Sequence, residues 1–199
     1  MRKEVRVAGF GGQGVILAGV ILAQASGAIE GREVAQTQSY GPEARGGAAR
    51  CDVVISDKRI LYPKVRQADL LLAMSQPALA KYAVDLDAAK GKVVIDSTLV
   101  NELPDGLPPV YRVPATKIAE EEFKNRIVAN MVMLGALARV DDVVAYDSLK
   151  RAVAENVAPK FRDLNLAAMD RGYQAVEGPG LRPAAGANDA PGAPASGGR

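Results

Sequence analysis

Short apolar runs of strand length recur along the N-terminal two thirds of the chain, and segments of helical length or glycine-rich loops separate them. The runs that we predict as strands are residues 4–9, 33–38, 48–56, 68–74, 91–97 and 110–113. Most are continuously apolar rather than alternating, which is typical of strands buried on both faces of a parallel sheet. The pattern therefore predicts an α/β fold, with a Rossmann-like, mostly parallel sheet and helices on both of its faces.

Helical periodicity dominates the last third of the chain. Apolar residues recur at helical spacing over residues 125–140, and two further helices are expected between residues 149 and 177, broken near Pro159. An earlier helix should begin at Pro77, which suits a first helical turn, and end near Val84. We expect residues 1–177 to form one domain with these C-terminal helices.

The last 22 residues, 178–199, differ in composition from the rest of the chain. They are rich in Gly, Pro and Ala and contain almost no large apolar side chains. Such a segment cannot bury enough surface to offset the entropy of ordering it. We predict a flexible tail, or one that is ordered by a partner chain.

Composition excludes several kinds of chemistry. The 199 residues include one cysteine and no histidine, so a Ser-His-Asp or Cys-His pair, an imidazole metal site and a cysteine-held cluster are all ruled out for this chain. We therefore predict no catalytic and no metal-binding residue. The net charge of +2 gives no argument for nucleic acid, and no apolar run reaches the ~20 residues that span a membrane. A cytoplasmic protein is the default expectation.

The stretch GFGGQG, residues 9–14, joins the first predicted strand to a long apolar segment at Val15–Ala23. Gly9, Gly11 and Gly14 satisfy the G-x-G-x-x-G pattern in its strand-to-helix context, which brings backbone N–H groups at a helix N-terminus close to an anionic group. An NAD site would also need a carboxylate at the end of the second strand. That position reads Gln36-Thr37-Gln38-Ser39. The glycines therefore either contact a ligand directly or only allow the helix to pack on the sheet.

A second loop, SYGPEARGG, follows the second predicted strand, and we expect it at the same sheet edge as the glycine loop. It places a phenol, a carboxylate and a guanidinium between glycines and a proline. Glu43 and Arg45 can equally form a solvated pair on a surface turn.

The lone thiol of Cys51 has two interpretations. Arg50 beside it could favour the thiolate. Its place in the middle of a predicted strand instead indicates a small buried apolar side chain, which is the interpretation we adopt.

Together the two loops resemble the γ subunit of the thiamine-diphosphate-dependent 2-oxoacid:ferredoxin oxidoreductases. The resemblance runs from Val5 to about Leu137 and includes the segments ISD, ADLLLAMS, VVIDSTLV and NRIVANMVMLGAL. It implies a subunit of a complex that converts a 2-oxoacid and coenzyme A to acyl-CoA and CO2 and passes electrons to ferredoxin or a similar acceptor. It also implies α, β and ferredoxin-like δ partners, with thiamine diphosphate, Mg and iron–sulfur clusters held by those other subunits.

Carried onto this chain, the resemblance places both loops toward coenzyme A, the substrate or the partner subunits. The residues concerned are Gly11, Gly12, Gln13, Gly14, Ser39, Tyr40, Gly41, Pro42, Glu43, Arg45, Gly46 and Gly47. Among them we expect Arg45 to contact an anion and the Gln13 amide to donate a hydrogen bond at the helix start.

Three alternatives stay open at this point. The chain could be the matching subunit of an indolepyruvate or other aryl-oxoacid enzyme, which shares these motifs. It could be a stand-alone nucleotide-binding Rossmann module, although the missing carboxylate argues against this. It could also be a structural scaffold whose glycine loops only pack against partners.

Overall fold

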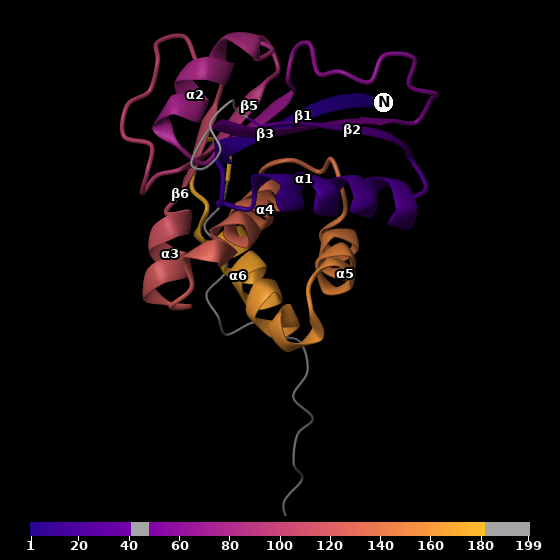
Figure 1. Ribbon diagram of the computed structural model, residues 1–199. Coiled ribbons are helices and arrows are strands. Elements are labelled where there is room, and N and C mark those ends of the chain that lie inside the picture. The colour runs from indigo at the N-terminus through magenta and orange to yellow at the C-terminus, as the bar shows by residue number, and fades with distance from the viewer. Residues whose placement is uncertain (41–47, 182–199) are drawn as a thin grey trace, which may run out of the picture.

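The computed structural model describes residues 1–40 and 48–181, and its centre is one six-stranded sheet (Figure 1). The strands lie in the order β2-β3-β1-β4-β5-β6. Their bounds are β1 Arg2–Phe10, β2 Glu33–Tyr40, β3 Ala48–Ser56, β4 Leu70–Ala73, β5 Lys92–Asp96 and β6 Val110–Val113. The pairings β1–β4, β4–β5 and β5–β6 are parallel, whereas β3 is antiparallel to both of its neighbours. The prediction of an α/β fold with a mostly parallel sheet is confirmed, and the sheet is mixed.

The antiparallel part of the sheet follows from the length of one connection. Residues 41–47 alone join β2 to β3, whereas a parallel crossover needs a dozen or more residues. The chain must therefore turn back after β2. In the sheet, β3 lies between β2 and β1.

Six α-helices are present in the described part of the chain. Their bounds are α1 Val15–Gln24, α2 Gln76–Tyr82, α3 Ala115–Glu121, α4 Ala129–Val140, α5 Tyr146–Asn156 and α6 Arg162–Ala175. Shorter turns accompany them: a π-helical turn at Ala25–Ile29 and 3-10 turns at Ala83–Asp85, Arg126–Val128 and Pro159–Phe161. The break between α5 and α6 falls near Pro159, as the sequence predicts. In the described part no helix is long and apolar enough to cross a membrane.

Helices cover both faces of the sheet, unequally. Figure 1 shows α1 and the C-terminal helices on one face and α2 on the other. Alternate strand residues supply the two cores: Leu70 and Leu72 of β4 belong to the core under α1 and α4, whereas Leu71 and Ala73 belong to the core under α2. The continuous apolar runs thus arise because each strand must fill both cores.

The larger core depends on close helix packing at two glycines. A Cβ added at Gly135 of α4 would overlap the carbonyl oxygen of Met169, and one added at Gly172 of α6 would overlap that of Val132. The two helices can therefore approach each other closely only while both positions lack a side chain.

Cys51 is fully buried on β3, as the sequence predicts. The Gln36 amide donates a hydrogen bond of 3.0 Å to its sulfur, and a Cβ at Gly19 of α1 would overlap the thiol. Burial raises the pKa of the Cys51 thiol above its ordinary value. The side chain is an unreactive part of the core.

The C-terminal segment closes one edge of the sheet. The backbone groups of Arg112 on β6 and of Glu177 exchange hydrogen bonds of 2.8 and 2.9 Å, and the chain then turns at residues 178–181. Residues 182–199 lie outside the described part of the chain, so the predicted tail stays a prediction.

Candidate functional site

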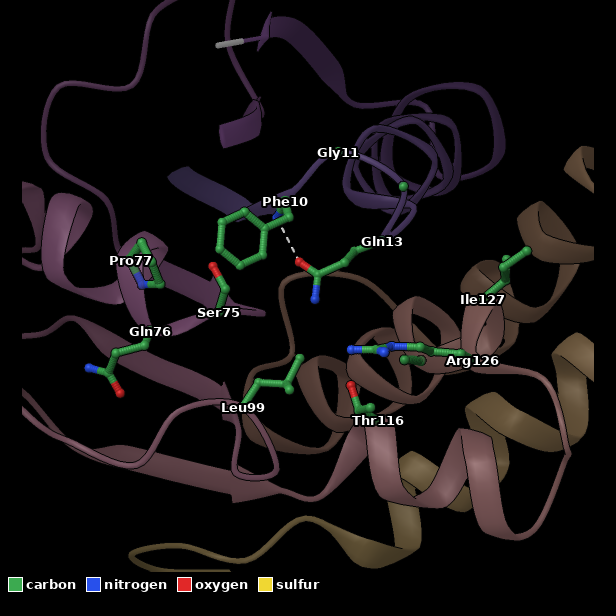
Figure 2. Close-up of a pocket in the computed structure, with 12 residues that line it drawn as sticks. Phe10, Gly11, Gln13, Ser75, Gln76, Pro77, Leu99, Thr116, Arg126 and Ile127 are labelled. Carbon is green, nitrogen blue, oxygen red and sulfur yellow. Dashed lines mark hydrogen bonds between the residues drawn. The ribbon is translucent and has the colours of Figure 1, made fainter. Parts of the chain in front are cut away.

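A cleft of about 570 Å³ opens at the carboxyl ends of the parallel strands (Figure 2). It lies at the point where the chain leaves β1 for strands on one side of the sheet and returns to β4 on the other, which is where ligands bind in open α/β sheets. The lining residues are Phe10, Gly11, Gly12, Gln13, Ser75, Gln76, Pro77, Leu99, Thr116, Arg126, Ile127 and Ala129. The glycine loop forms one wall of this cleft.

The glycines of this loop have structural reasons to be glycine. Gly12 and Gly14 have φ values of 94° and 72°, in the left-handed region that favours glycine. Gly14 also lies against Asn130 of α4, whose amide donates 3.2 Å to its carbonyl oxygen, and a Cβ there would overlap that amide. Packing and turn geometry therefore account for Gly12 and Gly14, whereas exposed Gly11 adds open backbone to the cleft wall.

Gln13 holds the loop in place. Its Oε1 accepts a 2.6 Å hydrogen bond from the Phe10 backbone N–H, and its Nε2 donates 2.9 Å to the carbonyl oxygen of Met74, just beyond β4. Figure 2 shows the first of these bonds at the rim of the cleft. The Gln13 amide thus bonds to the backbone next to β4, and its first role in this structure is to position the loop.

Polar side chains cap two of the helices around the cleft, but not α1. Ser75 caps α2 by accepting from the N–H of Ala78 at 3.3 Å. The buried Asp96 carboxylate caps α3 by accepting from the backbone and the hydroxyl of Thr116 at 3.1 and 2.5 Å. The N-terminus of α1 has neither a side-chain cap nor an acidic residue in its first turn. Because α1 begins directly after the loop that lines the cleft, the positive end of its dipole lies beside the cleft and can attract an anion.

Arg126 brings a full positive charge to the opposite wall. Its side chain is 62% exposed, and its Nε lies 3.5 Å from the Glu120 carboxylate, a long contact between exposed groups. Figure 2 shows the guanidinium extending into the cleft between Gln13 and Thr116. The site can therefore hold an anionic ligand between Arg126 and the α1 N-terminus.

Sequence reasoning missed Arg126, although a signal was present. Asn125 accepts from the N–H of Ile127 at 3.2 Å and so starts the turn that leads into α4. A cap residue followed by Arg and an apolar helix places that Arg at a helix N-terminus. Only the fold shows that this N-terminus faces the glycine loop, more than a hundred residues away in the sequence.

The second predicted loop begins and ends at the same sheet edge as the glycine loop, as expected. In the register of the sheet, Tyr40 pairs with Ala49 and Phe10 with Ala48. However, β3 separates β2 from β1, so Tyr40 starts about 10 Å from the glycine loop and does not line the cleft. The other predicted residues of this loop, Gly41, Pro42, Glu43, Arg45, Gly46 and Gly47, fall outside the described residues.

The strand order also bears on the dinucleotide alternative. In the NAD-binding fold the second strand lies beside the first, which brings its terminal carboxylate to the ribose. Here an antiparallel β3 occupies that place, and the end of β2 is Gln38-Ser39-Tyr40. The strand order and the missing carboxylate therefore argue against a dinucleotide at the glycine loop.

In the described part of the chain no group of three or more His, Cys, Asp or Glu side chains could hold a metal ion. The cleft offers hydrogen-bond donors, one guanidinium and apolar surface. These groups are suited to binding and orienting a ligand.

Several known proteins resemble this chain over most of its length. The chain is 47% identical to 2-oxoglutarate synthase subunit KorC of Methanocaldococcus jannaschii, over 89% of this chain and 95% of that subunit. It is 39% identical to ketoisovalerate oxidoreductase subunit VorA of Methanothermobacter thermautotrophicus, over 86% of this chain and 36% of VorA. It is 37% identical to the γ subunit of NADH-dependent phenylglyoxylate dehydrogenase of Aromatoleum evansii, over 87% of this chain and 93% of that subunit.

Solved structures agree. The γ subunit of a keto/oxoacid ferredoxin oxidoreductase from Geobacter sulfurreducens superposes with a TM-score of 0.78 at 40% identity, covering 87% of this chain and 97% of that one. A 2-oxoglutarate:ferredoxin oxidoreductase from Magnetococcus marinus, solved with 2-oxoglutarate, coenzyme A and succinyl-CoA bound, gives 0.77 at 28% identity, over 86% of this chain and 30% of that one. The family model described as pyruvate ferredoxin/flavodoxin oxidoreductase matches residues 4–175, and the chain belongs to this family.

Proposed function

We propose that this chain is the γ subunit of a 2-oxoacid:ferredoxin oxidoreductase whose substrate is 2-oxoglutarate. The observation that carries the proposal is the 47% identity to a 2-oxoglutarate synthase subunit over nearly the whole of both chains. Identity to the ketoisovalerate and phenylglyoxylate relatives is lower, at 39% and 37%. The complex would convert 2-oxoglutarate and coenzyme A to succinyl-CoA and CO2, and pass two electrons to ferredoxin or a similar acceptor.

The residues that this chain lacks indicate which cofactors the other subunits hold. With one buried cysteine and no histidine, it leaves thiamine diphosphate, Mg and the iron–sulfur clusters to α, β and ferredoxin-like δ subunits. Thiamine diphosphate supplies the carbanion chemistry of 2-oxoacid decarboxylation. The contribution of this chain is binding and orientation.

The cleft suits one part of coenzyme A. Arg126 and the open N-terminus of α1 offer charge-assisted and backbone hydrogen bonds to phosphate, while Phe10, Leu99 and Ile127 offer apolar surface. Because Gly11 and Gly12 have no side chains, a ligand can approach the backbone of the cleft wall closely. A relative was solved with coenzyme A bound, which supports coenzyme A as a ligand of the complex. Ser39, Tyr40 and residues 41–47, including Arg45, are proposed to lie toward the same ligand or toward the catalytic subunits.

The test is purification of the native complex without oxygen, followed by assay of coenzyme A-dependent dye or ferredoxin reduction. A panel of 2-oxoglutarate, pyruvate, ketoisovalerate, indolepyruvate and phenylglyoxylate identifies the substrate. The proposal expects the highest kcat/KM with 2-oxoglutarate. A preference for an aryl-oxoacid would instead favour the second candidate, for which the phenylglyoxylate relative is the supporting observation. A chain that binds NAD alone and has no partners would refute both.

A further inference from the structure

A basic loop, residues 57–67, projects from the edge of the sheet opposite the cleft. It joins the end of β3, where Ser56 pairs with Arg2, to the start of β4, where Leu70 pairs with Val5. Figure 1 shows this connection beside the N-terminus. The ligand of the proposed site does not explain why this distant loop carries its particular side chains.

Hydrogen bonds from β1 hold the backbone of this loop. The Glu4 carboxylate accepts from the N–H groups of Arg66 and Gln67 at 2.8 and 3.4 Å. The Arg2 guanidinium donates 3.1 Å to the carbonyl oxygen of Tyr62, and Val65 is buried in the core under α2. The loop therefore presents a preformed surface, which reduces the entropy that a binding partner would have to overcome.

Two large apolar side chains stand at the tip of the basic loop. Leu61 is 85% exposed and Tyr62 is 49% exposed. The guanidinium of Arg66 lies over the Tyr62 ring, 5.9 Å from its centre. A single exposed apolar residue is ordinary, but a Leu-Tyr pair beside Arg has the composition of a protein-binding hot spot.

Among the described residues, three cations of the basic loop lack acidic partners, whereas two neighbouring acids already have cations. Lys58, Arg59 and Lys64 are exposed and form no ion pair within residues 1–40 and 48–181. Nearby acids are already paired: Asp57 with the N-terminal ammonium at 2.6 Å, and Glu4 with Arg2 at 2.8 Å. Because the whole chain carries a net charge of only +2, this is a local concentration of positive charge.

We propose that the basic loop docks onto an acidic surface of another subunit of the oxidoreductase, an inference that rests on the proposed function. Leu61 and Tyr62 would enter the centre of the contact, and Lys58, Arg59 and Lys64 would face carboxylates around it. A second copy of this chain fits poorly, because a two-fold contact would bring the same three cations against one another. Charge complementarity, together with the apolar Leu61 and Tyr62, therefore favours a different, acidic polypeptide.

The experiment compares two charge-reversed chains within the assembled complex. K58E/K64E reverses two lysines of the basic loop, and K117E/K160E reverses two exposed lysines elsewhere with the same change in net charge. Each tagged chain is expressed with the other subunits, and the retained subunits are quantified at increasing NaCl. We expect K58E/K64E to weaken association about tenfold and the control to behave like the wild type.

Carbodiimide coupling of the wild-type complex identifies the contact directly, since it joins a lysine amine to a touching carboxylate. Coupling of Lys58 or Lys64 to Asp or Glu of another subunit supports the proposal. If the wild-type complex assembles but K58E/K64E dissociates no more readily than the control, the docking surface is refuted and the proposed function stands. Coupling only between copies of this chain also refutes it. If the wild-type chain retains no other subunit, both proposals fail.

Discussion

The two ends of the sheet offer different physical means of binding. At the carboxyl end, glycines, helix N-termini and Gln13 form a hollow in which Arg126 is the one charged side chain of the lining. At the opposite end, the basic loop projects outward, and the exposed Lys58, Arg59 and Lys64 around Leu61 and Tyr62 form no ion pair with any residue that the structure describes. A concave wall of backbone donors suits a small anionic ligand, and a convex charged surface suits a macromolecule. The fold thus keeps ligand binding and the proposed subunit docking apart.

The largest expected effect is on stability, and it measures how much the close contact between the glycine loop and α4 contributes. Gly14→Ala should destabilise the chain by about 2 to 4 kcal/mol, because it combines a left-handed φ with overlap on Asn130. Gly31→Ala is the matched control: Gly31 also has a φ of 72°, but a Cβ there meets open space, so we expect only about 1 to 2 kcal/mol. Urea unfolding measures both. Equal losses would mean that contact with Asn130 contributes nothing.

Removing the cleft's charge should change ligand binding without changing assembly. We expect Arg126→Ala to raise the KM for coenzyme A about tenfold in the complex, because a charge-assisted hydrogen bond to phosphate is lost. Arg126→Lys should recover part of the loss, since it keeps the charge but not the forked geometry. Arg151→Ala, on the exposed surface of α5, is the control. A complex with an unchanged KM would remove Arg126 from the site.

Substitutions in the basic loop should change subunit association and leave coenzyme A binding unchanged. We expect Leu61→Ala with Tyr62→Ala to weaken subunit association severalfold, since both would pack into the partner. The chain should lose at most about 1 kcal/mol of stability, because Leu61 is mostly exposed and Tyr62 is half exposed. Size-exclusion chromatography of the complex and thermal unfolding of the chain separate the two effects. A changed KM for coenzyme A in an intact complex would contradict the separation of the two ends.

The smallest effect belongs to the middle of the sheet, at Cys51. Its thiol pKa is raised by burial, so the unfolded chain loses this proton before the folded chain does. The thiol's contribution to stability is therefore complete below its ordinary pKa and decreases as the pH rises through 9.0. Relative to Cys51→Ala, the wild type should lose at most about 1 kcal/mol between about pH 9 and pH 10. Urea unfolding of both variants at both pH values tests this. If the wild type and Cys51→Ala lose the same stability between the two pH values, the thiol has the same pKa in the folded and unfolded chain.

Local patterns in the sequence are sufficient to predict most of the elements. The strand–glycine loop–helix unit at the N-terminus and the helix leading from Asn125 to Val140 are confirmed because apolar runs, caps and glycines act within a few residues. The direction of β3 does not follow from its apolar run. It depends on the short connection at residues 41–47, which is visible in the sequence but acts through strand pairing.

The residues of the site also fall into those that the sequence predicts and those that only the fold brings together. The GFGGQG motif alone predicts one wall of the cleft, because its glycines have a local geometric reason. Arg126 and Thr116, from the other wall, lie more than a hundred residues away and enter only because parallel strands end at a common edge. The same holds for the basic loop: its charges are visible in the sequence, but their lack of partners is not.

The sequence by itself determined the strands and helices, the glycine loop, the absence of histidine and of a cysteine cluster, and a resemblance specific enough to name a family. Only the tertiary structure decided which residues meet at the cleft, that Gln13 positions the loop, and that the cations of the basic loop stay unpaired. The physical reason is range: periodicity, turns and caps act between neighbours in the chain, whereas a cleft or a docking surface is made by contacts between residues that the fold alone brings together.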